Sequence, residues 1–292
     1  MNRYDEFARH YIDLEFSGNT LSDYVYDELT DMEKELDEYI TGENTIPTKN
    51  VYKSVMDEIN DEIEKRKAII KKRITADTDK TVSKENKWIS GMVSAEVASE
   101  VILNKISMIP FNGKMTIDQF IDGLFSDIYN SYEIPVRTSY ILKGTISSFI
   151  NQLNRRNSNI NVRAESSSQC IIPSVAKNTD RYVMQRYSSI KTWTWISMLD
   201  TSTCIACGDL SGTTYTDLSS APPCPLHNKC RCYFYPGVVE QPSYYEWFEK
   251  QDEKDKYEIL GKTRYNLYKS GSKVKNFVNN GKKLTIDEIF SK

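Results

Sequence analysis

Five of the six cysteines and one of the two histidines of this chain lie in one short stretch, between Cys204 and Cys232. The rest of the 292-residue sequence holds one cysteine, Cys170, and one histidine, His10. Thiolate and imidazole groups are the ligands that Zn2+ and related transition metals prefer in proteins. This clustering predicts a metal site that fixes the fold of the region around it.

The spacing within the stretch suits a zinc knuckle. Cys204 and Cys207 are separated by two residues, and Gly208 follows, which allows the tight backbone reversal that such a turn needs. His227 comes after an interval that two short strands and a turn would fill. The sequence therefore predicts a small sheet held together by a metal ion.

Six residues of the stretch compete for the four places of a tetrahedral site. Cys230 and Cys232 flank Arg231, so in a strand both thiols would lie on one face. Cys224 lies among three prolines and is the weakest candidate. Ligands supplied by the protein alone would make the site closed and structural, so we expect structural Zn2+. The predicted ligands are Cys207, His227 and Cys230, with Cys204 and Cys232 contesting the fourth place.

Disulfides, free buried thiols and a catalytic Cys–His pair are the alternatives for the same residues. The N-terminal segment lacks the apolar region of a signal peptide, so we expect a reducing compartment, in which disulfides are disfavoured. The density of thiols favours metal ligation over catalysis. Cys170 is expected to be an ordinary buried or half-buried thiol.

Composition narrows the class of protein. Apolar residues make up 39% and charged residues 27% of the chain, which is typical of a globular protein. The net charge of −3 and the pI of about 5.7 do not favour nucleic acid as the main partner. Since no apolar run approaches the roughly 18 residues that span a bilayer, we expect no membrane association. The chain is expected to be soluble and intracellular, or part of an assembly built inside a cell.

Helical periodicity dominates the N-terminal half. Residues 1–75 predict an acidic helix and a second helix with a basic end, which would form a hairpin arm. The polar residues 76–86 predict a loop or linker. Thr116 and Gln119 form a capping-box pattern at the start of an apolar helical stripe.

Two further boundaries are predicted in this half. Pro135 precedes a helix expected over residues 136–155, because proline is favoured at helix starts. The polar residues 155–169 predict another loop.

The periodicity changes to that of strands near residue 190. Aromatic and β-branched residues predict short strands at 192–196, 213–215 and 232–235. Helix returns over residues 243–292. The predicted fold is α+β: a helical N-terminal half, then a small antiparallel sheet with a structural zinc knuckle, and C-terminal helices. The predicted domains are a helical arm over 1–75 and an α+β domain over 86–292, with its zinc-binding segment at 200–236.

Two blocks of this sequence resemble a known family. The first runs from Trp195 through Cys204, Cys207, Gly212 and Pro222-Pro223 to His227-x2-Cys230-Arg231-Cys232. The second includes 245–251, 259–264 and 267–271, and a weaker match is Val136-Arg137-Thr138. Together they resemble the signature of tailed-phage minor head proteins, the Mu-type F or SPP1-type head morphogenesis family, over roughly residues 86–290.

The resemblance implies a bacteriophage head component present in few copies. Such a protein would bind the portal protein, the major capsid protein or both during head assembly, and would act in DNA delivery. It would lie in the virion, in the head interior, after a period in the host cytoplasm. Non-specific contact with packaged DNA is expected as a side property.

Two alternative functions remain open. Some domains related to the family are fused to toxins, and parts of the family have been likened to ADP-ribosyltransferases. Such transferases need an arginine, a Ser/Thr motif on a strand and a catalytic glutamate. Arg137 and Thr138 lie in a helical pattern, and neither Glu165 nor Glu246 is a convincing partner, so we expect no enzyme and no catalytic residues. A zinc-dependent nucleic-acid-binding module is the other alternative. Its support is a set of basic residues near the C-terminus: Lys262, Arg264, Lys269, Lys273, Lys275, Lys282 and Lys283.

Overall fold

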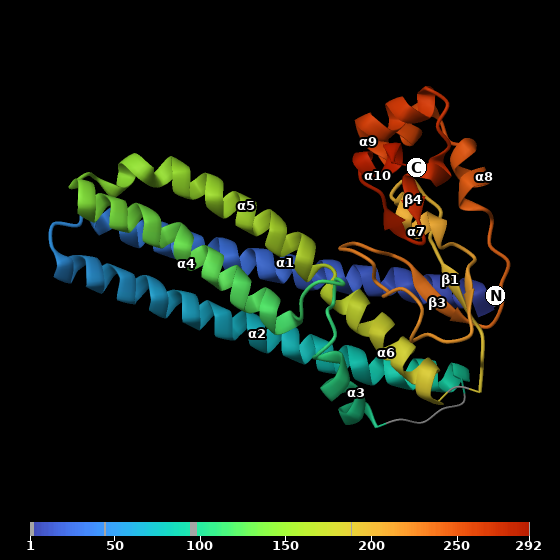
Figure 1. Ribbon diagram of the computed structural model, residues 1–292. Helices are drawn as coiled ribbons and strands as arrows, with labels where there is room; N and C mark the ends of the chain where they lie inside the picture. Colours follow the sequence, from blue (N-terminus) through green and yellow to red (C-terminus); the bar gives the residue numbers. More distant parts are fainter. Residues whose placement is uncertain (1–2, 44, 94–97, 188, 292) are drawn as a thin grey trace. The chain divides into compact units, whose positions relative to one another are not determined.

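The computed structural model describes residues 3–43, 45–93, 98–187 and 189–291 (Figure 1). The chain forms two compact units. The helical unit comprises Asp13–Ser83 and Leu103–Val175, and the metal unit comprises Met1–Ile12, Lys84–Ile102 and Ala176–Lys292. The predicted α+β class is confirmed: helices make up the N-terminal half, and a small antiparallel sheet and further helices follow.

The helical unit contains most of two helices, α1 (Arg3–Glu43) from Asp13 onward and α2 (Lys49–Val93) as far as Ser83. Arg66 of α2 donates to the carboxylates of Glu28 (2.9 Å) and Glu35 (2.6 Å) of α1. The guanidinium of Arg73 lies 4.7 Å from the ring centre of Tyr24. Because later residues of α2 contact earlier residues of α1, the two helices run antiparallel in this unit. The buried residues of α1 follow helical spacing: Leu21, Val25, Leu29, Met32, Leu36 and Ile40.

The predicted loop at 76–86 is wrong, because α2 continues through it to Val93. Val82 and Ile89 are fully buried and lie two helical turns apart. The hydroxyl of Thr81 donates to the carbonyl of Asp77 (2.7 Å), one turn back. The side chains of Val82 and Ile89, and Trp88 between them, anchor the helix, although most of the neighbouring residues are polar. One boundary between the two compact units lies within this helix, between Ser83 and Lys84.

The two boundaries expected near Pro135 and at 155–169 are also wrong. Helix α4 (Ile117–Leu142) contains Pro135 and ends where Lys143 adopts a left-handed conformation with φ 54°. The 3-10 helix η1 (Ile146–Phe149) and helix α5 (Ile150–Ser168) follow. The buried stripe of α5 mixes apolar and polar side chains, so its helical period is weak in the sequence: Leu153, Asn157, Ile160, Asn161, Ala164 and Ser168. The capping box before α4 is confirmed, with Thr116 and Gln119 exchanging hydrogen bonds of 3.3 and 2.9 Å.

The three-stranded sheet of the metal unit has the order β2–β1–β3. Strand β1 (Trp193–Ile196) pairs antiparallel with β2 (Thr214–Tyr215) and with β3 (Tyr233–Pro236), as the alternating pattern predicts. Trp195 of β1 faces Phe234 of β3 across the pair. The unit also contains the C-terminal part of α6 (Ile171–Tyr187) and the start of α3 (Ser99–Ile106).

Aromatic side chains from distant parts of the sequence form the core beside the sheet. Tyr11 of α1 stacks on Tyr233 of β3 with 4.3 Å between ring centres. Phe7 meets Trp88 of α2 edge to face at 4.7 Å. Aromatic pairs of this kind stabilise by about 0.5–1.5 kcal/mol beyond the area that they bury.

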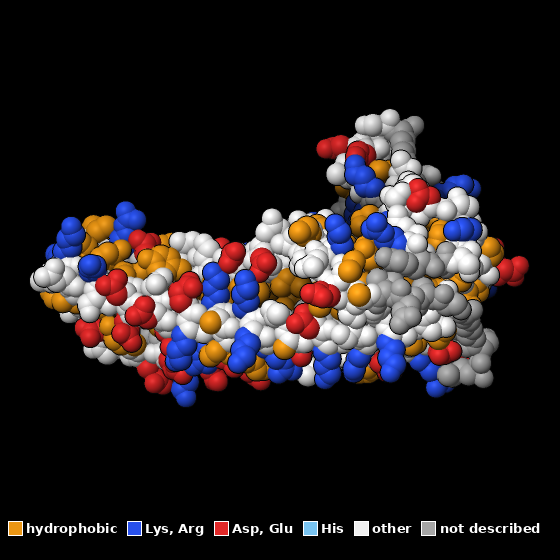
Figure 2. Space-filling view, turned by 90° about the horizontal axis from the view of Figure 1, so that it is seen from below, with side chains coloured by type: hydrophobic (Ala, Val, Ile, Leu, Met, Phe, Trp, Pro, Cys, Tyr) orange, Lys and Arg blue, Asp and Glu red, His pale blue; other side chains and the backbone are white. Residues whose placement is uncertain are grey.

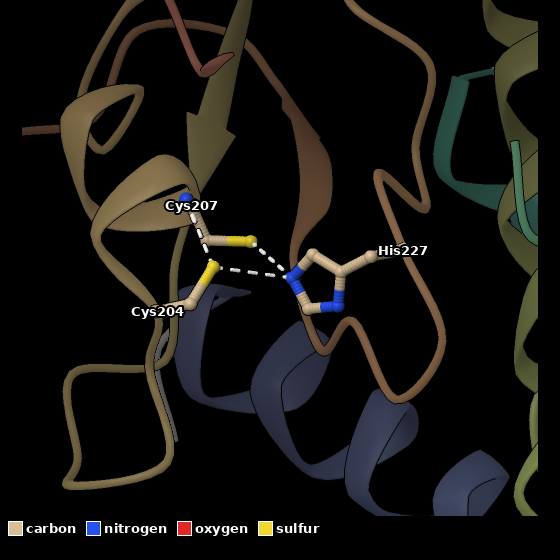
Figure 3. A group of neighbouring side chains, drawn as sticks. All are labelled: Cys204, Cys207 and His227. Carbon is tan, nitrogen blue, oxygen red and sulfur yellow. Dashed lines mark hydrogen bonds between the residues drawn. The ribbon is translucent and has the colours of Figure 1, made fainter. Parts of the chain in front are cut away.

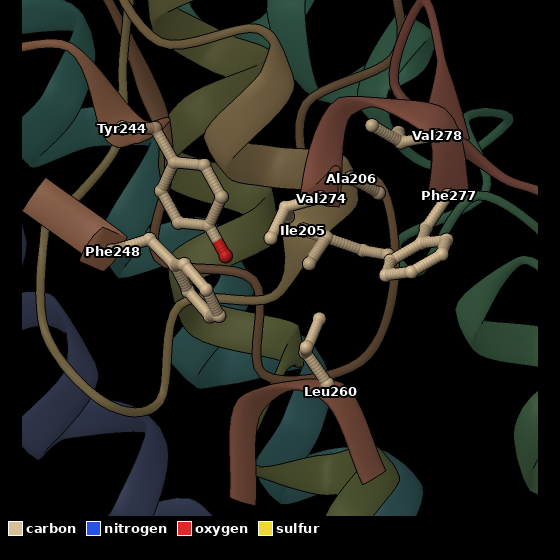
Figure 4. Close-up of a cluster of buried hydrophobic side chains, with 8 residues drawn as sticks. All are labelled: Ile205, Ala206, Tyr244, Phe248, Leu260, Val274, Phe277 and Val278. Atoms are coloured by element: carbon tan, nitrogen blue, oxygen red, sulfur yellow. The ribbon is translucent and has the colours of Figure 1, made fainter. Parts of the chain in front are cut away.

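The C-terminal part of the metal unit surrounds a second apolar core (Figure 4). Its elements are α8 (Tyr244–Glu249), α9 (Glu253–Lys269), η2 (Val274–Phe277) and α10 (Ile286–Phe290). A short hairpin of β4 (Val278–Asn279) and β5 (Lys282–Lys283) interrupts the predicted helical segment. No described helix is both long and apolar enough to cross a membrane. On the face shown in Figure 2, basic and acidic side chains are interspersed.

Candidate metal centre

Helix α7 (Ile205–Asp209) supplies one of the cysteines, Cys207, and the residue that caps its start supplies another. Cys204 is the N-cap residue of this helix, and its sulfur accepts a hydrogen bond from the backbone N–H of Cys207 (3.5 Å). Gly208 packs so closely on the ring of Tyr244 that a Cβ atom there would collide with it. The glycine of the expected knuckle therefore serves close packing of α7 on α8.

His227 reaches both of these thiols (Figure 3). Its Nε2 atom lies 3.2 Å from Sγ of Cys204 and 3.2 Å from Sγ of Cys207. Its Nδ1 atom lies 2.6 Å from the carbonyl oxygen of Asn228. An Nδ1–H that donates to this carbonyl leaves the Nε2 lone pair free, which is the arrangement of a metal-ligating histidine.

A second group of thiols adjoins the first. Sγ of Cys207 lies 3.7 Å from Sγ of Cys230, and these two sulfurs and that of Cys232 all lie within 4.8 Å of one another. Cys204, Cys207 and His227 form the other such group. The five residues predicted as ligand candidates are therefore brought together in two triads that share Cys207, and this cluster could hold a metal ion.

Cys224 lies outside both triads, as its low rank among the candidates suggested. It is buried, and its thiol donates to the carbonyl of Cys232 (3.0 Å). Cys170 is buried and belongs to the helical unit, so it is the ordinary thiol that was expected.

Two polar residues that the sequence did not single out support the cluster. The hydroxyl of Ser197 donates to the carbonyl of Cys207 (2.7 Å) and lies 3.4 Å from Sγ of Cys232. The ammonium of Lys177, which is only 3% exposed, donates to the carbonyl of Cys230 (2.7 Å). Arg231 forms an ion pair with Asp200. Nothing in the local pattern around Lys177 or Ser197 indicates these contacts, because they depend on the tertiary fold.

The thiols of the cluster differ in how readily they lose a proton, because hydrogen bonds between the sulfurs raise the pKa of Cys207 and burial raises that of Cys232, whereas the pKa values of Cys204 and Cys230 are lowered. The hydrogen bond from Cys207 and the imidazole of His227 lower the pKa of the Cys204 thiol to about 4. The hydrogen bond to Cys204 raises the pKa of His227 to about 9, although burial opposes this. Hydrogen bonds from Cys207 and Cys224 also lower the pKa of Cys230. Buried thiolates favour a cation between them, and a bound metal ion would take the place of protons on these ligands.

Comparison with protein-family models, with curated proteins and with solved structures returned no match. The residues considered for a transferase site lie on helices. Arg137 on α4 is an exposed partner of Glu133 (3.5 Å), and the hydroxyl of Thr138 donates to the carbonyl of Ile134 (2.7 Å). Arg137 and Thr138 therefore do not lie on the strand that a transferase motif requires.

Proposed function

We propose that the cluster binds one structural Zn2+ ion through Cys204, Cys207, His227 and Cys230. A tetrahedral zinc ion holds two sulfurs about 3.8 Å apart and a sulfur and a nitrogen about 3.5 Å apart. The Cys207–Cys230 separation is 3.7 Å, and His227 Nε2 lies 3.2 Å from the sulfurs of both Cys204 and Cys207. Cys230 is not within 4.8 Å of both other ligands, Cys204 and His227, so a bound ion would draw these side chains together by about 1 Å or more.

Cys204 is preferred to Cys232 as the fourth ligand for a geometric reason. Cys204 and Cys207 lie at equal distances from the imidazole nitrogen. Cys232 belongs to the triad without the histidine, and its sulfur lies beside the Ser197 hydroxyl. With four protein ligands the ion has no open position for substrate or water, so its role is to stabilise the fold.

We further propose that the chain is a minor structural protein of a tailed bacteriophage head, which binds the portal protein, the capsid interior or both. The observation that carries this proposal is that both sequence blocks resembling the head morphogenesis family belong to one compact unit. Ile205 and Ala206 of the metal segment pack with Tyr244 and Phe248 of the C-terminal block (Figure 4). The resemblance therefore extends over a folded body that contains both blocks.

Co-sedimentation tests the proposal. The chain is produced together with a portal protein and a major capsid protein from the same genome, and particles are separated on a gradient. We expect a few copies of the chain per particle. A chain that stays at the top of the gradient, while particles form normally, would refute the head-protein proposal.

A matched pair of variants shows whether the metal unit is needed for that association. Cys207→Ser alters the shared ligand, and Cys170→Ser changes a buried thiol of the helical unit. We expect the first variant to be absent from particles and the second to sediment like the wild type.

A further inference from the structure

A polar pocket of about 360 Å³ lies in the helical unit between α1 and α5. Two carboxylates, those of Glu33 and Asp37, line it from α1. Asparagine side chains line it from α5, and no basic side chain is among the described residues that form it. The pocket therefore offers acceptor oxygens and negative charge without a counter-charge of its own.

The floor of the pocket is held by a hydrogen-bond network. The hydroxyl of Tyr132, on α4, donates to Oδ1 of Asp37 (3.1 Å). Asn157 donates to the Tyr132 hydroxyl (3.2 Å) and accepts from the hydroxyl of Ser131 (2.8 Å). Asn157 is 3% exposed and has both amide atoms paired, so this part of the floor is complete.

Asn161 lies one helical turn after Asn157, and Glu33 lies one turn before Asp37; the hydrogen bonding of this second pair is incomplete. Asn161 is 7% exposed, and its amide nitrogen donates to Oε2 of Glu33 (3.0 Å). The oxygen of that amide and Oε1 of Glu33 are both buried and have no hydrogen-bond partner among the described residues. Buried polar atoms in native proteins are nearly always paired, and an unpaired one costs about 1–3 kcal/mol. The two neighbouring acceptors indicate a ligand that brings N–H donors.

The electrostatics of the pocket favour a cation. Burial, reinforced by the charge of Asp37, raises the pKa of Glu33 to about 7. Burial also raises the pKa of Asp37. Both shifts mean that the ionised forms of the two carboxyl groups are destabilised in the pocket, and a bound cation would stabilise them.

The shape of the pocket and of its rim distinguishes between cations. A bare metal ion would fill a small part of 360 Å³. Two adjacent acceptors, one of them a carboxylate oxygen, suit the planar fork of a guanidinium. At the rim, the ring of Tyr26 is 43% exposed and Val162 is 60% exposed, which provides an aromatic face and an apolar contact for a methylene stem.

We propose that this pocket binds an alkylguanidinium group, presented as an arginine side chain by a partner protein. The guanidinium donates to Oε1 of Glu33 and to the amide oxygen of Asn161, and its charge is balanced by Glu33 and Asp37. This inference does not depend on the metal site or on the proposed head function.

The test is an equilibrium titration of the full chain at pH 8, followed by NMR. The probe is N-acetyl-arginine methylamide, and the matched control compound is the citrulline analogue, which has nearly the same shape and no charge. We expect saturable binding of the arginine compound at millimolar concentration and none of the citrulline compound. Binding should weaken at least tenfold in Glu33→Gln, which still accepts from Asn161, and remain unchanged in Glu38→Gln, an exposed position of the same helix.

Several outcomes would overturn the proposal. The first is equal binding of the arginine and citrulline compounds, and the second is an affinity that Glu33→Gln leaves unchanged. The third is saturation by Ca2+ or Mg2+ with no response to the arginine compound, which would assign the acceptors to a metal ion. Thermal unfolding of each variant confirms that the fold is retained before affinities are compared.

Discussion

The substitution Cys207→Ser tests the metal centre most directly, because Cys207 is the residue that both triads share. Without its sulfur, no three of the remaining described ligand candidates form either of these groups. Structural zinc binds to zinc-finger peptides with about 10–16 kcal/mol at pH 7, so one ligand of four accounts for about 3 kcal/mol. For a unit of this size, that loss lowers the Tm by about 6–12 °C.

Two other serine variants serve as controls. Cys224→Ser changes a buried thiol of the same segment that lies outside both triads, and a serine hydroxyl can still donate to the carbonyl of Cys232. Cys232→Ser tests the ligand choice, since it leaves the triad with His227 intact. We expect both proteins to retain about one zinc per chain, with Tm values close to that of the wild type.

The assay combines metal content by mass spectrometry with calorimetric unfolding, under reducing conditions. Cys207→Ser should contain little zinc and should melt earlier. A Cys207→Ser protein that holds one zinc per chain and keeps its melting temperature would refute the ligand assignment. Wild-type protein that contains no metal and does not change on chelation would refute the metal centre itself.

Three further predictions concern other parts of the chain. The folded-state pKa of Glu33, about 7, lies above its ordinary value, so the folded state retains a proton that the unfolded chain has lost. The contribution of Glu33 to the free energy of unfolding therefore falls by about 1–3 kcal/mol as pH rises from about 4.5 to about 7, after allowance for its partial exposure. Calorimetry at several pH values should show that Glu33→Gln removes this fall. Gly208→Ala should destabilise the metal unit by about 2 kcal/mol or more in urea titrations, because the added methyl group would collide with the ring of Tyr244. Gly91→Ala is the control: its methyl group contacts nothing, and it should stabilise the protein by about 0.4–1 kcal/mol. Thr116→Ala should cost about 1 kcal/mol in the same titrations, through loss of the cap of α4, and an unchanged midpoint would contradict this.

The parts of the fold that the sequence predicts correctly are those with a strong local signal. The capping box at Thr116 is confirmed because its hydrogen bonds join residues three apart. The sheet strands are confirmed because β1 alternates aromatic and β-branched residues over its whole length. The clustering of Cys204, Cys207, His227, Cys230 and Cys232 also follows from the sequence, since the chemistry of their side chains restricts how they can be arranged.

The errors occur where tertiary contacts decide the local structure. Residues 76–86 are polar, yet they are helical because Val82 is buried within the same turn-by-turn series as Ile89. Helix α5 buries Asn157 and Asn161 on the stripe that a sequence pattern expects to be apolar. These asparagines meet Tyr132 and Glu33, which lie far away in the sequence, so no local pattern could indicate them.

The metal cluster and the C-terminal core both include residues of one short helix, α7, or of its N-cap. Helix α7 has five residues, too few to be stable without tertiary contacts. Cys204 and Cys207 lie at its start and belong to the metal cluster, while Ile205 and Ala206 between them pack with Phe248 in the C-terminal core. A metal ion would fix the first turn of α7 and thereby place both apolar side chains. The apolar core in turn holds the two cysteines at the spacing that the ion needs, so each feature would stabilise the other.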